Sequence, residues 1–165
     1  MKKLLVFLLL LMPALGQTSL SASPTVDYVL VIKAERKIFL MQGGVPVKEY
    51  PISLGLRPVG HKVFEGDMRT PEGLYVLDWR NANSNFYKSI HISYPSPDDV
   101  ARAMAIGKSP GGMIMIHGLP SNKKNIDERL LMDSDWTEGC IAVSNQAMDE
   151  IWSSVTDGTP IVILP

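Results

Sequence analysis

The sequence predicts an α+β fold rich in β-strands, a mixed β-sandwich or open barrel with two or three short helices. Short apolar runs with alternating polar residues recur along the chain, and turns that contain Gly or Pro separate them. Only two stretches have the apolar spacing and the end signals of amphipathic helices. No internal repeat or linker divides the chain after residue 26, so we expect one domain.

The expected elements follow one another closely. Gly43 and Gly44 form a turn between two early strands, and the turn at 70–73 begins another strand. Acidic residues open the first helix at its positive end, and Asn145 is expected to cap the second, which Gly158 ends. The polar stretch 119–136 is expected to be a loop with one helical turn. The predicted strands are 27–32, 37–41, 45–54, 74–79, 90–94, 113–116 and 161–164, and the predicted helices are 99–106 and 146–155.

The first 16 residues have the features of a secretory signal peptide. Lys2 and Lys3 precede the apolar run 4–12, and small residues at positions 14 and 16 resemble a cleavage site. The run is too short to span a bilayer core of roughly 30 Å as a helix, although an uncleaved anchor is the alternative. We therefore expect a signal peptide at 1–16, although a cut as late as residue 22 is also compatible with the sequence. A loose leader at 17–26 and the folded domain at 27–165 follow. No stable membrane anchor is expected after processing.

The composition argues against several classes of function. The 165 residues carry 16 basic and 17 acidic side chains, so nothing indicates the basic surface of a nucleic-acid binder. The single Cys excludes an intrachain disulfide and a multi-Cys zinc site. His61, His91 and His117 lack the spacing of a zinc enzyme, so no metal is expected. His61 is expected to be exposed, whereas His91 either lines a cleft or faces solvent.

Cys140 and His117 are the candidate catalytic residues. Gly139 leaves space for a substrate beside the thiol and permits a tight turn there. Because the thiolate is the nucleophile, Cys140 needs a nearby base or cation. His117 ends the apolar run 113–116, and an imidazole held at the mouth of a strand can accept and return a proton near neutral pH. The alternatives are a buried, inert Cys and a structural His.

The loop 65–73 offers a candidate substrate contact. Gly66, Pro71 and Gly73 demand a defined backbone, and the planar guanidinium of Arg69 suits a carboxylate. The alternative is a solvated turn in which Arg69 pairs with a neighbouring acidic residue.

Several motifs occur in a fixed order through the chain. His117-Gly118 precedes Trp136-Thr137-x-Gly139-Cys140-Ile141, and the segments 50–55, 66–73 and 158–161 add further motifs. Together they resemble the L,D-transpeptidase (YkuD-type) catalytic domain family, in particular its shorter members with a Trp-Thr-x-Gly-Cys-Ile-Ala-Val pattern. The resemblance extends from about residue 28 to residue 165.

The resemblance implies an enzyme of the cell envelope, located in the periplasm, with no cofactor. Family members cleave the peptidoglycan stem peptide after diaminopimelate through a Cys thioester. An amine of a second stem then takes the acyl group to give a 3–3 crosslink, or a lipoprotein lysine or water takes it. By position, Cys140 is the nucleophile, His117 the base and the Gly118 carbonyl the group that orients the imidazole, while backbone N–H groups at Gly139 and Cys140 form the oxyanion hole.

Two positions depart from the family pattern. Many members have a His just before the Gly-Cys pair and an Arg two residues after the Cys, where this chain has Glu138 and Ala142. The pocket is therefore expected to be less cationic, and substrate carboxylates need another partner, for which Arg69 is the candidate. The residues expected to bind substrate are Arg69, His91, Tyr94, Thr137 and Glu138.

The sequence leaves two alternative functions open. A hydrolase on the same scaffold, an L,D-carboxypeptidase or an amidase of peptidoglycan stems, needs the same nucleophile and base. A non-catalytic wall-binding or redox protein needs neither. If His117 activates Cys140, we expect the thiol to be alkylated rapidly below pH 7.

Overall fold

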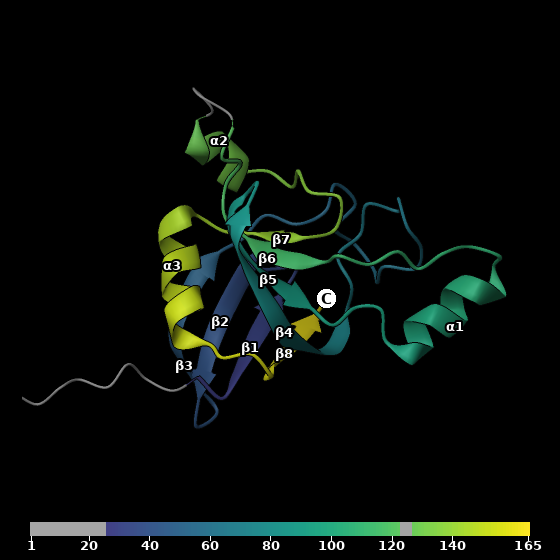
Figure 1. Ribbon diagram of the computed structural model, residues 1–165, viewed down its shortest axis with the longest axis horizontal. Coiled ribbons are helices and arrows are strands. Elements are labelled where there is room, and N and C mark those ends of the chain that lie inside the picture. The colour runs from purple at the N-terminus through teal and green to yellow at the C-terminus, as the bar shows by residue number, and fades with distance from the viewer. Residues whose placement is uncertain (1–25, 123–126) are drawn as a thin grey trace, which may run out of the picture.

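The computed structural model describes residues 26–122 and 127–165. The predicted signal peptide and nearly all of the predicted leader lie outside the described residues. Within these residues the chain forms eight strands and three helices, which Figure 1 labels. The strands are β1 (Tyr28–Ile32), β2 (Lys37–Gln42), β3 (Val45–Pro51), β4 (Gly73–Ser84), β5 (Tyr87–Ile92), β6 (Met115–His117), β7 (Ile141–Ala142) and β8 (Thr159–Leu164), and the helices are α1 (Pro97–Ala105), α2 (Glu128–Met132) and α3 (Asn145–Ser154).

All eight strands belong to one mixed sheet in the order β3-β2-β1-β8-β4-β5-β6-β7. β1 pairs with β8, and β6 with β7, in parallel, whereas the other neighbours are antiparallel. Isolated bridges join Ser53 to Ala142 and Gly55 to Thr137, so the segment after β3 reaches the opposite end of the sheet. The predicted α+β, β-rich class is confirmed, in the form of a single sheet that is not a closed barrel.

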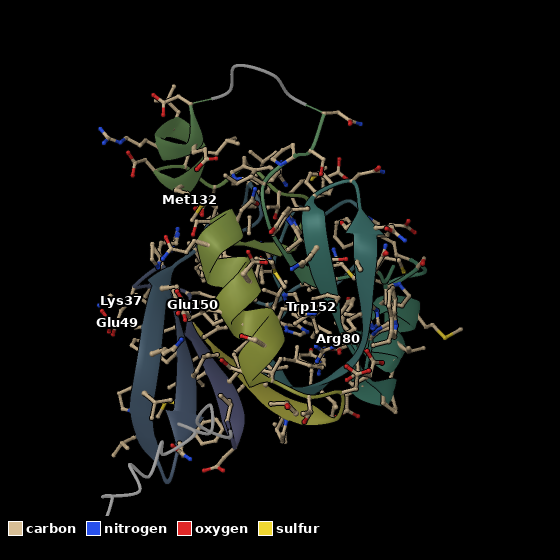
Figure 2. All side chains as sticks on the ribbon, turned by 60° about the vertical axis from the view of Figure 1, so that its left-hand side comes forward. Lys37, Glu49, Arg80, Met132, Glu150 and Trp152 are labelled. Carbon is tan, nitrogen blue, oxygen red and sulfur yellow. The ribbon has the colours of Figure 1, made fainter. Side chains whose placement is uncertain are left out.

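α3 covers one face of this sheet (Figures 1 and 2). Alternate residues of β1 are buried, as a strand with one covered face requires, and they join the apolar side of α3 in one core. The members of this core include Val29, Val31, Leu40, Leu77, Ile90, Ile116, Ile141, Met148, Ile151 and Ile163.

Polar contacts fix α3 to both halves of the sheet. Figure 2 shows Trp152 of α3 beside Arg80 of β4, whose guanidinium carbon lies 4.9 Å from the centre of the indole ring. Two residues earlier in the helix, Glu150 accepts hydrogen bonds from Lys48 and Tyr50 of β3. These contacts hold α3, whose first turn carries contacts to the site described below, against the sheet.

The helix starts differ from those predicted. Ser144, not Asn145, is the N-cap of α3, and its side chain accepts a hydrogen bond from the Ala147 N–H. Ser96 caps α1 at Pro97, in a reciprocal capping box with Asp99. Ser and Asn are nearly equivalent caps, so local sequence could not decide which of the two neighbours takes the position.

Parts of β4 and β5 and all of β7 were not predicted. β4 continues through a polar stretch to Ser84, and β5 begins at Tyr87, so a long two-stranded ribbon with register shifts extends past the predicted ends. The strand β7 has only two residues, too few to show the alternation of apolar and polar residues from which strands are predicted. In the described part of the chain, no helix has the length and apolar composition needed to cross a bilayer.

Candidate active site

Cys140 and His117 line the same cavity, which has a volume of about 600 Å³. His117 is the last residue of β6, and Cys140 directly precedes β7. The two strands pair in parallel, with His117 opposite Ala142, so residues far apart along the chain reach one edge of the sheet together. The pairing of these two short strands thus creates the candidate site.

Gly118 fixes the imidazole of His117. Its carbonyl oxygen lies 2.7 Å from Nδ1, and because a carbonyl only accepts, Nδ1 carries the proton and Nε2 is the basic nitrogen. The rings of Phe86 and Trp136 pack against the imidazole, with centroids at 4.6 and 5.6 Å. The buried imidazole is therefore held in one tautomer and one orientation.

Burial shifts both pKa values towards the neutral forms. Desolvation lowers the pKa of His117, and the hydrogen bond to Gly118 only partly opposes this. Burial raises the pKa of Cys140, while a backbone hydrogen bond from Met115 and the charge of Lys62 lower it. These directions favour a neutral thiol beside a neutral imidazole. A raised thiol pKa is the opposite of what rapid alkylation below pH 7 requires, so that expectation stays a prediction for experiment.

Thr137 organises the turn that carries the nucleophile. Its hydroxyl accepts a hydrogen bond of 3.1 Å from the Gly139 N–H and donates one of 2.8 Å to the Cys140 carbonyl. Gly139 has φ 135°, and a Cβ there would lie 2.6 Å from the Arg69 carbonyl oxygen. Thr137 therefore engages the Gly139 N–H, whereas within the described residues no hydrogen bond engages the Cys140 N–H.

Gly118 is required by a close approach of α3. A Cβ at this position would lie 2.6 Å from Oδ1 of Asn145 and 2.9 Å from Cβ of Tyr87. The same Asn145 oxygen accepts a hydrogen bond of 2.9 Å from the Leu119 N–H. Asn145 thus anchors the chain that leaves β6 instead of capping α3, and it supports the carbonyl that orients His117.

The five expected substrate-binding residues divide into two groups. Thr137 and the exposed Glu138 line the cavity. The other three line neither this cavity nor the smaller one described next. Arg69 contacts the His61 carbonyl, Tyr94 is buried with its hydroxyl donating to Pro110, and His91 is hydrogen-bonded to Asp78 and stacked on Trp79.

A second cavity, of about 220 Å³, also borders Cys140. Lys62 lines it, although its side chain is only 3% exposed and its ammonium group forms a 2.9 Å ion pair with Asp67. Lys62 was not predicted as a site residue, because it lies in a charged, Gly-containing stretch that resembles solvated surface. His61, which was expected to be exposed there, is half-buried and hydrogen-bonded to Asp99.

The site residues do not form a metal-ligand set. Within residues 26–122 and 127–165, no group of three or more His, Cys, Asp or Glu side chains is placed to hold a metal ion. The groups at the site that can take part in chemistry are the Cys140 thiol, the His117 imidazole and nearby backbone N–H groups.

A family match and a curated relative both point to the same family. The YkuD family, described as the L,D-transpeptidase catalytic domain, matches residues 26–163. YafK of Escherichia coli K12, which carries a provisional L,D-transpeptidase name, is 30% identical over 136 residues, 78% of this chain and 47% of its own.

Solved structures share the fold. A point mutant of Pgp2, the helical cell shape determining protein of Campylobacter jejuni, has a TM-score of 0.62 and 26% identity, over 84% of this chain and 46% of that one. An L,D-transpeptidase from Mycobacterium tuberculosis H37Rv has a TM-score of 0.56 and 16% identity, over 86% of this chain and 58% of that one. The chain thus spans about half the length of YafK and of Pgp2.

Proposed function

The chain belongs to the L,D-transpeptidase catalytic domain family, and from this premise we propose that it is a cysteine acyltransferase of the cell envelope, acting in the periplasm. Its proposed substrate is the tetrapeptide stem of peptidoglycan, cleaved after diaminopimelate. The proposed acceptor is an amine of a second stem, which gives a 3–3 crosslink, or of a protein. The observation that carries the proposal is the cavity shared by Cys140 and a His117 whose Nε2 is the basic nitrogen.

The first step forms a thioester. Sγ of Cys140 attacks the carbonyl carbon of diaminopimelate as its proton passes to Nε2 of His117, and the Cys140 N–H donates to the developing oxyanion. The bond to the terminal D-Ala nitrogen then breaks, and His117 returns the proton to that nitrogen. D-Ala leaves as a free amino acid, and His117 is neutral again.

The second step releases the acyl group. The acceptor amine attacks the thioester carbon, its proton passes through His117 to sulfur, and the S–C bond breaks. Water can take the place of the amine with the same proton transfers, giving an L,D-carboxypeptidase, or an amidase where the leaving group is a protein amine. The exposed Glu138 carboxylate lines the cavity with Cys140 and can bind an acceptor amine as its ammonium, which must lose a proton before the neutral nitrogen attacks.

Product analysis tests the proposal. Purified protein is incubated with disaccharide-tetrapeptide, and the products are separated by chromatography and identified by mass. Transfer gives 3–3 dimers, whereas hydrolysis gives tripeptide and free D-Ala. Cys140→Ala and His117→Ala are expected to abolish product in both cases. Product formation by Cys140→Ala at the wild-type rate contradicts the thioester route.

A further inference from the structure

The smaller cavity brings a buried cation to the nucleophile. Both Lys62 and Cys140 line it, and the charge of Lys62 partly opposes the burial that raises the pKa of Cys140. Gly66, Gly111 and Gly112 also line the cavity, so part of its wall has no side chains. It therefore has room for a small polar group next to the sulfur.

The ammonium of Lys62 keeps donor capacity for a ligand. It donates to Asp67 Oδ1 at 2.9 Å and to the Phe64 carbonyl at 3.2 Å. A Lys ammonium has three N–H donors, so within the described residues one donor has no acceptor. An anionic group that enters the cavity can supply it with a charge-assisted hydrogen bond.

Asp67, the partner of this cation, is held by several further donors. Backbone N–H groups of Val63 and Phe64 donate to Oδ2, and that of Arg69 donates to Oδ1. Burial alone raises the pKa of Asp67, but these bonds and the one from Lys62 hold it below its ordinary value. Asp67 is therefore an ionised partner of Lys62, and the charge of Lys62 still acts on the thiol, where it opposes the effect of burial on the pKa of Cys140.

The other charged residues that line the cavity are acidic. Glu65 and Glu138 are exposed, so water and salt screen them more than the buried Lys62. Together the three charges complement a group that carries an ammonium and a carboxylate on one carbon.

Such a group takes part in both steps of the proposed reaction, the formation of the thioester and its aminolysis. The leaving D-Ala carries its carboxylate on the carbon next to the nitrogen that leaves. The side-chain amine of diaminopimelate, as an acceptor, carries its carboxylate in the same relation to the nitrogen that attacks. The same position next to Cys140 therefore suits both amines.

On the basis of the proposed function, we propose that Lys62 is a specificity-determining residue that binds the α-carboxylate of the amine component, both the departing D-amino acid and the arriving acceptor, in the cavity shared with Cys140. This assigns to Lys62 the carboxylate recognition that sequence reasoning gave to Arg69, which lines neither cavity.

The test compares two donor stems that differ only in the carboxylate. One stem tetrapeptide ends in D-Ala, the other in D-alaninamide, and kcat/KM for loss of the terminal residue is measured for each. The wild type should prefer the carboxylate by roughly tenfold to a hundredfold, the range for a hydrogen bond between charged groups. Lys62→Gln should abolish the preference mainly through the carboxylate substrate, and Lys62→Arg should retain part of it.

Lys33→Gln is the matched control. Lys33 is a second buried lysine, 2% exposed and paired with Glu72, but it lines neither cavity. It should lose stability and keep the substrate preference. Thermal melts of all variants confirm that they fold.

Three outcomes contradict the inference, and they are distinguishable. If the wild type turns over both stems at equal rates, the role of Lys62 is overturned, but the proposed function is not. Equal losses on both stems in Lys62→Gln show that Lys62 acts on the thiol rather than on the substrate carboxylate. A wild type that consumes neither stem and forms no thioester overturns the proposed function and this inference with it.

Discussion

The hydroxyl of Thr137 connects the nucleophile turn to the proposed oxyanion hole. It accepts from the Gly139 N–H and donates to the Cys140 carbonyl, and the residue is 4% exposed. In the proposed mechanism, closing the turn in this way leaves the Cys140 N–H as the donor to the oxyanion. Thr137 also lines the cavity, so the substrate contact expected from sequence stays a prediction beside this positioning role.

Replacing Thr137 by Val should therefore slow catalysis with little change in shape. The substitution removes both hydrogen bonds and releases the turn, so kcat should fall by about tenfold to a hundredfold, comparable with losing part of an oxyanion interaction. Thr137→Ser keeps the hydroxyl and should stay close to wild type. Steady-state kinetics on the tetrapeptide check this, and a rise in KM with unchanged kcat would instead indicate a substrate contact.

At the scale of elements, the start of α3 and the end of β6 form one unit. Ser144 caps α3, while Asn145 accepts from the Leu119 N–H and packs against Gly118. The helix therefore supports the carbonyl that fixes the tautomer of His117. Ser144 and Asn145 have similar capping propensity, but Ser144 caps the helix and Asn145 anchors the segment after β6.

Alanine substitutions should separate these two tasks. Ser144→Ala removes a helix cap and should lower the free energy of unfolding by about 1 kcal/mol with activity retained. Asn145→Ala leaves the Leu119 N–H without its acceptor and should reduce kcat as well as stability, because the chain after His117 loses its anchor. Urea denaturation and kinetics measure both. Equal effects on kcat in the two variants would show that the helix start, not the anchor, matters.

At the scale of the whole molecule, the fold buries a titratable dyad at the edge of the sheet. Desolvation lowers the pKa of His117, and the unfolded chain has the ordinary imidazole pKa, about 6.5. Below that pH the unfolded state binds a proton that the folded state does not. The contribution of His117 to stability is therefore present above pH 6.5 and is lost as the pH falls towards the lowered pKa.

This predicts a pH-dependent difference between the wild type and His117→Gln. Between pH 7.5 and pH 5.5 the wild type should lose more free energy of unfolding than the variant, by up to about 1.4 kcal/mol per pH unit. The hydrogen-bonded carboxylates Asp67 and Asp99, whose pKa values lie below their ordinary range, lose their contribution only in more acidic solution. Parallel pH profiles for the two proteins would show that His117 titrates normally in the folded state.

Periodic patterns gave most of the fold correctly. The alternating runs placed β1, β2 and β8, and the spacing of apolar residues placed α3, because these elements bury one face of a regular strand or helix. β7, the extension of β4 and the exact helix caps were missed, because only pairing with distant segments decides them.

The sequence by itself determined the residue types that the chemistry requires, a Cys after Gly139 and a His before Gly118, and the strand-rich fold that holds them. Only the tertiary structure decided which charges surround the thiol: Arg69 and His91 lie outside both cavities, and Lys62 lies buried beside Cys140. The physical reason is that backbone periodicity is local, whereas burial and electrostatic proximity depend on which segments the sheet brings together.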